Sequence, residues 1–402
     1  MKRSRKLMMF SISFLMLVGC GREDETGGNK SIIQHNNQEV GQISIAQNTF
    51  ANTLLSEVWK ENKGENMLVS PYSVYHALSM LYTGADAQTK EDLVELLELQ
   101  PNDAIGPALK QQLDHLHNTD IELQVANSVW YGNGAILFDD YIADMETMFD
   151  ADVSDELTVD GINSWVNEKT KGRIPTVVEK IKEDTIAYLI NTVFFDAKWG
   201  EPFTETPNQP FYLTENKSIE VPFMALETTM PYVKTEEVEV VKIAYEDPRF
   251  SMLVALPNES VTDLGESIKH LSELSFNEKA VEVKLPLFTF EQKHNLEQIL
   301  SAMGMASLFE NASLNQMFEA IPGAYTYIDE VIQKAMIEVD TEGTVAAAVT
   351  AVGITLESSI EMDHHTRFVA DRPFLYAILD EETNIVLFAG VMMDPSEQGD
   401  FE

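Results

Sequence analysis

Cysteine is almost absent from this chain, since Cys20 is the only one in 402 residues. No disulfide can therefore form within the chain, and the fold must depend on its apolar core. Cationic side chains are also few, because 27 Lys and Arg stand against 66 Asp and Glu, which gives a formal net charge of −39. This charge disfavours nucleic acids and heparin-like polymers as partners and favours cationic proteins, although an acidic surface kept for solubility explains it as well.

Catalytic motifs are absent too. The sequence contains no Gly-x-Ser-x-Gly or His-Glu-x-x-His motif and no glycine-rich phosphate-binding loop. The run Asp363-His364-His365 carries metal-binding residue types, but adjacent side chains seldom converge on one ion. The sequence therefore predicts no enzymatic activity, no cofactor and no metal site.

The N-terminus carries cationic residues and then an apolar run from Leu7 to Val18, the pattern of a secretory signal peptide over residues 1–19. The run ends in Leu17-Val18-Gly19-Cys20, which resembles the box of bacterial lipoproteins, where the cysteine receives lipid and becomes the new N-terminus. The alternative is an ordinary signal peptide followed by a chance cysteine. We expect a lipid anchor at Cys20 and a position on the extracellular face of the bacterial cell membrane.

Residues 20–44 are polar, with only scattered apolar side chains, and predict a flexible tether. About 24 residues of such a chain have a typical reach of about 25–30 Å, which lifts a domain clear of the lipid headgroups. Helical patterns then dominate the first part of the chain and strand patterns the second, which favours an α+β fold. Ser70 and Pro71 predict a helix start, residues 189–195 a central strand, and residues 374–391 a hairpin.

The most unusual segment runs from Thr344 to Leu356 without a charge or an aromatic ring. It is too short to span a bilayer, which needs roughly 20 apolar residues, and its β-branched residues favour a strand. Gly343 precedes it as a flexible point, and every second residue after Gly343 is small or apolar. The segment is either a buried strand or, if exposed, a strand kept exposed for a function.

This segment and its flanks, DTEGTVAAAVTAVGITLESS, resemble the hinge and reactive-centre loop of the serpins. Five further segments resemble serpin motifs in the family's order, and the resemblance covers residues 45–395. They are NMLVSPYSVYHALSML (66–81), INSWVNEKTKGRIPTVV (162–178), LINTVFFDAKWGEPF (189–203), LPLFTFEQKHNLEQILSAMGMASLF (285–309) and DRPFLYAILDEETNIVLFAGVMMDP (371–395). The chain thus resembles a serpin in a bacterial lipoprotein form.

The resemblance implies a serpin-like fold with three β-sheets, about eight or nine helices, an exposed reactive-centre loop at about 340–372 and an acidic C-terminal tail at 396–402. It also implies a monomeric suicide-substrate inhibitor of serine proteases, with cysteine proteases as a second target class. The protease attacks the loop, an acyl-enzyme forms, and the cleaved loop inserts into the main sheet as a new strand. The alternative is a non-inhibitory binding protein of the same fold.

Site residues follow from the resemblance. The family's usual spacing, counted from the hinge glycine Gly343, gives Glu357–Ser358 as the scissile bond, with Leu356–Glu357 and Ser358–Ser359 as alternatives. The hinge that leads insertion comprises Gly343, Thr344, Val345, Ala346, Ala347, Ala348, Val349 and Thr350. Small residues there favour an inhibitory member, because non-inhibitory relatives often carry charged or bulky ones.

Two further clusters match family positions. Ser70, Ser73 and Asn191 match the polar "shutter" beneath the main sheet, and Trp199 matches the "breach" where insertion begins. Gln333 stands where the family commonly has His, so pH gating through that position is not expected, because an amide does not titrate. Thr341 replaces the usual Glu at the loop base, so the salt bridge expected there is absent.

The residue before the scissile bond indicates the target. Glu357 favours a glutamyl-specific serine protease, because a buried carboxylate needs a cationic partner in the primary pocket. If Leu356 docks instead, the target is a subtilisin-, chymotrypsin- or elastase-like enzyme.

The lipoprotein box makes a prediction for Cys20. Wild-type protein expressed in a bacterium should partition into the detergent phase of a Triton X-114 extraction, and Cys20→Ala should partition into the aqueous phase, because the acyl chains are lost. Aqueous partitioning of both proteins would exclude the anchor.

Overall fold

The computed structural model describes residues 26–99, 105–117, 121–183, 185–258, 264–319, 328–344 and 366–399, and their side chains from residue 41 onward except at 117, 122–124, 264 and 272. Contact density divides the chain into Met1–Gln38 and Glu39–Glu402, and the account below concerns the second unit. The expected signal peptide, Cys20 and the expected scissile bond lie outside the described residues.

The first helix is longer than expected. α1 spans Thr26–Glu61 and so begins inside the segment 20–44 that was expected to be a flexible tether. No proline interrupts residues 26–61, and Gln, Glu and Lys are good helix formers although they are polar. Polarity alone therefore did not distinguish a tether from a helix. Among the described residues, no helix is both long enough and apolar enough to cross a bilayer.

The other helices lie mostly in the first part of the chain, as expected. α2 begins after Ser70, whose hydroxyl accepts a hydrogen bond from Ser73 N, with Pro71 at its first position, and this confirms the expected helix start. The helices are α2 (Pro71–Gly84), α3 (Ala87–Leu96), α4 (Ile105–His117), α5 (Asp139–Met148), α6 (Val159–Lys169), α7 (Leu264–Ser272), α8 (Glu297–Leu300), a π-turn (Ser301–Met305) and α9 (Ala306–Glu310).

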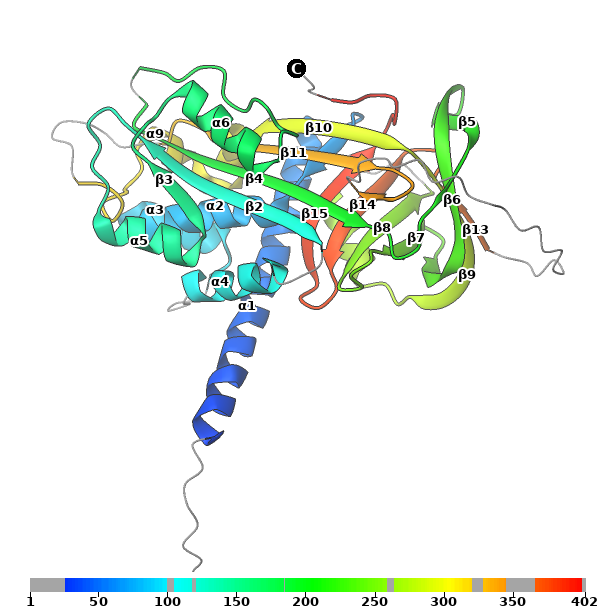
Figure 1. Cartoon of the computed structure of the whole chain (residues 1–402), viewed down its shortest axis with the longest axis horizontal. Coiled ribbons are helices and arrows are strands. Elements are labelled where there is room, and N and C mark those ends of the chain that lie inside the picture. The colour runs from blue at the N-terminus through cyan, green and yellow to red at the C-terminus, as the bar shows by residue number, and fades with distance from the viewer. Residues whose placement is uncertain are drawn as a thin grey trace, which may run out of the picture. The chain divides into compact units, whose positions relative to one another are not determined.

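A six-stranded sheet crosses the upper part of the molecule in Figure 1. Its strand order is β10-β11-β12-β4-β2-β3. The bounds are β10 (Phe288–Asn295), β11 (Val331–Val339), β12 (Gly343–Thr344), β4 (Ala187–Lys198), β2 (Glu122–Tyr131) and β3 (Ala151–Ser154). β11 and β4 run parallel and pair directly over residues 331–335 and 189–193, and we call this pairing the seam.

The remaining strands form a nine-stranded sheet in the order β1-β15-β14-β8-β7-β6-β9-β13, with β5 paired to β6. The bounds are β1 (Met67–Val69), β5 (Thr204–Thr214), β6 (Lys217–Lys234), β7 (Val238–Ala244), β8 (Phe250–Pro257), β9 (Asn277–Pro286), β13 (Thr366–Val369), β14 (Phe374–Asp380) and β15 (Ile385–Met392). Among the described residues, hydrogen bonding connects the strands into two sheets where three were expected, because the 18-residue strand β6 pairs with β5, β7 and β9 and joins two of the expected sheets. The α+β class and the hairpin β14–β15 are confirmed.

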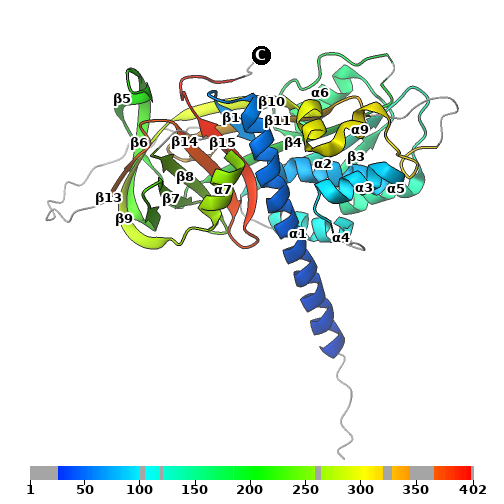
Figure 2. The ribbon, with the colours of Figure 1, turned by 180° about the vertical axis from the view of Figure 1, so that it is seen from behind.

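Alternation along β4 explains how the two sheets pack. Val193, Phe195 and Ala197 face the nine-stranded sheet and join its core, whereas Tyr188 and Ile190 face the other way. On that outer face α6 packs against the six-stranded sheet, and Figure 1 shows it above β4 and β2. The helices α1 and α7 cover the opposite side of the nine-stranded sheet, as Figure 2 shows from behind. The six-stranded sheet is therefore covered by the nine-stranded sheet on one face and by α6 on the other.

Candidate functional site

The expected hinge begins inside the six-stranded sheet. β12 lies between β11 and β4 at the end of the seam, antiparallel to both strands. Gly343 pairs with Lys198, and Thr344 pairs with Ala197 on one side and Val339 on the other. Thr344 is only 1% exposed. The first two residues of the hinge therefore already occupy the start of a strand position between β11 and β4.

Only glycine fits at position 343. A Cβ atom there would lie 2.2 Å from the carbonyl oxygen of Ala197 and 2.8 Å from Cα of Lys198. Both neighbours are backbone atoms of a central strand, which cannot move aside cheaply. The close approach of two backbones thus explains the hinge glycine by packing.

The turn before β12 is held by Asp340. Its Oδ1 accepts hydrogen bonds from the backbone N–H of Glu342 at 2.8 Å and of Gly343 at 3.0 Å. The backbone N–H of Asp340 donates to the Gly343 carbonyl at 3.0 Å. The Thr341 carbonyl accepts from Phe203 N at 2.8 Å, so a backbone contact holds this base where the family's salt bridge is missing. This agrees with the general tendency of an Asp side chain to accept a hydrogen bond from the backbone N–H two residues on.

Trp199 and Tyr245 form the wall against which the hinge rests. The indole Nε1 of Trp199 donates to the Asp340 carbonyl at 2.8 Å. The Trp199 ring stacks on Tyr245 with centroids 4.8 Å apart and an interplanar angle of 9°, and Tyr245 OH shares a hydrogen bond of 2.8 Å with Thr344 Oγ1. Burial raises the pKa of Tyr245 far above its usual value, so this hydroxyl stays neutral. Trp199, the expected breach residue, thus lies beside the start of the hinge, together with Tyr245, which sequence reasoning missed.

The polar cluster beneath the seam is assembled around Gln333. Its Nε2 donates to the Ser70 carbonyl at 2.8 Å and to Ser73 Oγ at 2.6 Å, and its Oε1 accepts from Ser70 N at 3.0 Å. Ser70 Oγ donates in turn to the Leu387 carbonyl of β15 at 2.7 Å. All three polar residues are at most 1% exposed. Gln333 therefore ties β11 to the start of α2 with three hydrogen bonds.

Asn191 lies opposite Gln333 in the seam, but its side chain forms its hydrogen bond with β2 and not with Gln333. The two residues are partners in the seam, yet Asn191 Nδ2 donates to Asn127 Oδ1 of β2 at 2.8 Å. Asn191 is 2% exposed, and its Oδ1 has no hydrogen-bond partner among the described residues. The structure thus brings Ser70, Ser73 and Gln333 into one network and leaves a buried acceptor next to it on β4.

The outer face of β11 is tied to the segment that follows α6. Arg173 Nη1 lies 3.0 Å from Glu338 Oε2, and Lys334 Nζ donates to the Thr176 carbonyl at 2.9 Å. Lys334 also forms an ion pair of 2.6 Å with Glu291 of β10, and both side chains are buried. Sequence reasoning missed these contacts, although the two charges Lys334 and Glu338 in the mostly apolar strand VIQKAMIEV are an available signal.

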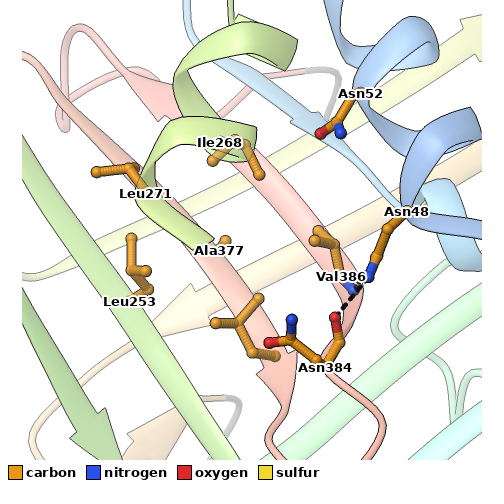
Figure 3. A pocket seen from close by; sticks show the side chains of 9 residues that line it. Asn48, Asn52, Leu253, Ile268, Leu271, Ala377, Asn384 and Val386 are labelled. Carbon is orange, nitrogen blue, oxygen red and sulfur yellow. Dashed lines mark hydrogen bonds between the residues drawn. The ribbon is translucent and has the colours of Figure 1, made fainter. Parts of the chain in front are cut away.

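A second, unrelated feature is a small pocket between α1, α7 and the hairpin β14–β15. Figure 3 shows apolar side chains at its floor, including Leu253, Ile268 and Ala377. At its rim, Asn48 Nδ2 donates to the Asn384 carbonyl at 2.8 Å. Its volume is about 30 Å³, which is room for about one water molecule.

Several expected site residues lie outside the described residues. They are Val345, Ala346, Ala347, Ala348, Val349, Thr350, Leu356, Glu357, Ser358 and Cys20. The described part of the candidate site therefore consists of the hinge start, its wall and the seam below it.

Comparison with known proteins agrees with this geometry. A family model described as "Serpin (serine protease inhibitor)" matches residues 45–395. An uncharacterized serpin-like protein of Thermococcus kodakarensis is 31% identical over 369 residues, covering 86% of this chain and 85% of its own. Antitrypsin of Bombyx mori is 28% identical and covers 88% of this chain and 94% of its own.

Solved structures support the same fold. Serpin48 of the insect Tenebrio molitor, a highly specific serpin, superposes with a TM-score of 0.79 at 24% identity, covering 88% of this chain and 98% of its own. Human thyroxine-binding globulin complexed with thyroxine also superposes with a TM-score of 0.79 at 24% identity, and the match covers 89% of this chain and 100% of the globulin chain. Since the family model spans both sheets and the hinge, the chain belongs to the serpin family.

Proposed function

We propose that the protein is a suicide-substrate inhibitor of serine proteases, which traps its target by inserting the cleaved loop between β11 and β4. One observation carries the proposal: the hinge residue Thr344 already pairs with both strands, and Gly343 pairs with β4. In the first step the protease serine Oγ attacks the scissile carbonyl, and its proton passes through the protease histidine to the leaving amine. The loop then remains joined to the protease through an ester, and insertion must outrun hydrolysis of that ester.

The strand registers support insertion without sliding. Continuing β12 in its present pairing would bring Ala348 opposite Val193 of β4 and Ala335 of β11. Those two residues are already partners in the seam. The strands therefore need only separate sideways by one strand spacing, about 4.8 Å, while their relative shift along the sheet is kept. No other hydrogen-bond register of the sheet has to change.

The residues that would enter the inner face are suited to it. Side chains alternate along a strand, so Ala346, Ala348 and Thr350 would share the buried face of Thr344. The same register would bring Thr350 between Gln333 and Asn191, which face each other in the seam. Among the described residues, the buried Oδ1 of Asn191 has no hydrogen-bond donor. A hydroxyl donor there would satisfy it, and an unsatisfied buried acceptor costs about 1–3 kcal/mol. Insertion thus relieves a polar defect of the intact sheet.

The second candidate is a non-inhibitory binding protein, as thyroxine-binding globulin, which was solved with thyroxine, illustrates for the fold. The pocket of Figure 3 is the feature that favours it, because apolar side chains and amides meet there. Its volume of about 30 Å³ is far below the roughly 300–1,000 Å³ of sites for drug-sized ligands. The hinge geometry is therefore the stronger support, and it favours inhibition.

We also propose that the inhibitor acts at the cell surface, held there by the lipid expected at Cys20. The sequence supports this through the lipoprotein box alone. The net charge of −39 favours a cationic protease over an acidic one.

Thr344→Arg should convert the inhibitor into a substrate. Thr344 is the first inward side chain of the inserted strand, and an arginine there would bury a charge without a partner, at a cost of several kcal/mol. We expect the protease to cleave this variant at the wild-type rate but to form no SDS-stable complex with it. Gel electrophoresis measures both the cleavage and the complex. Nicked wild-type protein should melt above the intact form, and nicked Thr344→Arg should not.

Thr344→Val is the matched control, because it keeps the size and removes the hydrogen bond to Tyr245. It should retain most of the complex. Full trapping by Thr344→Arg would show that insertion led by the hinge is not the mechanism.

Gln333→Ala should loosen the seam. It removes three hydrogen bonds and leaves Ser70 N–H buried without an acceptor, which should lower the stability of the intact protein by about 1–3 kcal/mol. The spontaneous, heat-induced conversion of intact protein to a more stable form should accelerate. Gln112→Ala is the control, since Gln112 is equally buried and bonded to Gln47 but lies on α4, away from the seam. Equal acceleration by both variants would argue against a special role for Gln333.

Glu357 and Leu356 can be separated by their targets. Glu357→Gln should abolish trapping of a glutamyl-specific protease and leave trapping of a subtilisin-like enzyme intact, because only the former pocket requires a carboxylate. If Leu356 is instead the residue that enters the primary pocket of the protease, Leu356→Gly should abolish trapping of the subtilisin-like enzyme and leave trapping of the glutamyl-specific one intact. The N-terminal residue released by cleavage, identified by mass spectrometry, decides the register: Ser358 supports the proposed bond, and Glu357 shifts it by one residue.

A further inference from the structure

The chain after β15 folds back along the six-stranded sheet. Asn66 holds its start, because its Oδ1 accepts from Met393 N at 2.7 Å and Asp394 N at 2.9 Å, and its Nδ2 donates to the Asp394 carbonyl at 2.7 Å. The Asp394 carboxylate then accepts from Ser396 N at 2.9 Å. Since Asn66 directly precedes β1, this anchor belongs to the nine-stranded sheet.

The end of this segment pairs with the edge of the other sheet. Glu291 N of β10 donates to the Gln398 carbonyl at 3.0 Å, and Gly399 forms a parallel bridge with Glu291. β10 is the outermost strand of its sheet. Figures 1 and 2 both show the red C-terminal segment running beside β10. The segment thus links the two sheets and occupies part of an otherwise free strand edge.

Glu291 connects this contact to the seam. Its backbone bonds to the C-terminal segment, while its carboxylate pairs with Lys334 of β11 at 2.6 Å. Lys334 donates in turn to the Thr176 carbonyl in the segment that covers β11. Both charged side chains are buried, so separating them would leave unpaired charges in the interior. Any displacement of β10 is therefore passed to β11, one of the two seam strands.

We propose that residues 394–399 form a clasp that restrains the β10–β11 pair and slows the separation of β11 from β4. The clasp holds β10 to the nine-stranded sheet through Asn66 and keeps the edge strand from fraying. This proposal concerns opening of the sheet and does not require that any protease is trapped. The clasp proposal rests on the proposed function in one respect: loop insertion is the event that the clasp would delay.

Gly399 allows a sharp test. Its φ is +79°, and a Cβ atom there would lie 1.9 Å from the Glu291 carbonyl oxygen and 2.9 Å from Phe290 Cε2. Gly399→Ala therefore cannot dock as the native segment does. Gly134 has the same φ of +79° with no atom within 4 Å of its Cβ position. Gly134→Ala is thus a matched control that carries the backbone strain without the collision.

The measurement is amide hydrogen exchange of the full chain, read in peptides that cover β10 and the seam residues 331–335 and 189–193. In Gly399→Ala we expect exchange in both regions to accelerate about tenfold, the factor that corresponds to loss of one strong backbone hydrogen bond. Gly134→Ala should leave both regions unchanged. A chain that ends at Pro395 should behave like Gly399→Ala, and one that ends at Gly399 should behave like wild type.

Two outcomes would overturn the clasp. Unchanged exchange in β10 would mean that the segment does not hold the edge strand. Faster exchange in β10 with an unchanged seam would mean that it covers an edge without restraining the opening. Failure of the wild type to form an SDS-stable complex would instead contradict the proposed function, and the exchange results would stand independently of it.

Discussion

The parallel pairing of β11 with β4 is the contact on which the rest of the structure depends. Only five residue pairs join the two strands, and the hinge residues Gly343 and Thr344 lie where this pairing ends. Hydrogen bonds between parallel strands are slanted and slightly less stable per residue than those between antiparallel strands. On their other sides, β11 pairs with β10 and β4 with β2 in longer antiparallel ladders. The sheet is therefore weakest where a new strand would have to enter.

Besides the apolar packing of the seam, buried polar contacts hold β11 in its place next to β4. Gln333 bonds to α2 on the inner face, and Lys334 bonds to Glu291 and Thr176 on the outer face. Such groups are costly to leave unpaired in the interior, so their loss raises a barrier. They can also be satisfied again by an inserted backbone and by a hydroxyl such as that of Thr350. A network of this kind would suit the proposed opening of the sheet, because it slows the change without preventing it.

Sequence patterns predicted the parts of the site that carry local signals. Ser70 followed by Pro71 predicted a helix start, and Gly343 and Thr344 form a short strand as the pattern predicted, while residues 345–356 of that predicted strand lie outside the described residues. Tyr245 and Gly399 were not predictable in this way, because their partners Thr344 and Glu291 lie about a hundred residues away in the chain. The joining of strands through β6 could not be predicted for a related reason, because no local signal shows that β6 pairs with three neighbours. The helical start of α1 was missed because polar residues are compatible with helix and tether alike.

If the cleaved loop inserts as proposed, the positions of the charged contacts predict the order of events. The next residue to enter after Thr344 is Val345, which in the present register would lie opposite Glu338 on the outer face. Glu338 is bound to Arg173, and both side chains are about 30% exposed, so this pair contributes little and opens easily. Four residues later Val349 would reach Lys334, whose pair with Glu291 is buried. In the proposed insertion the steepest part of the barrier would therefore lie at Lys334, and the C-terminal segment reaches β10 at Glu291, the ion-pair partner of Lys334.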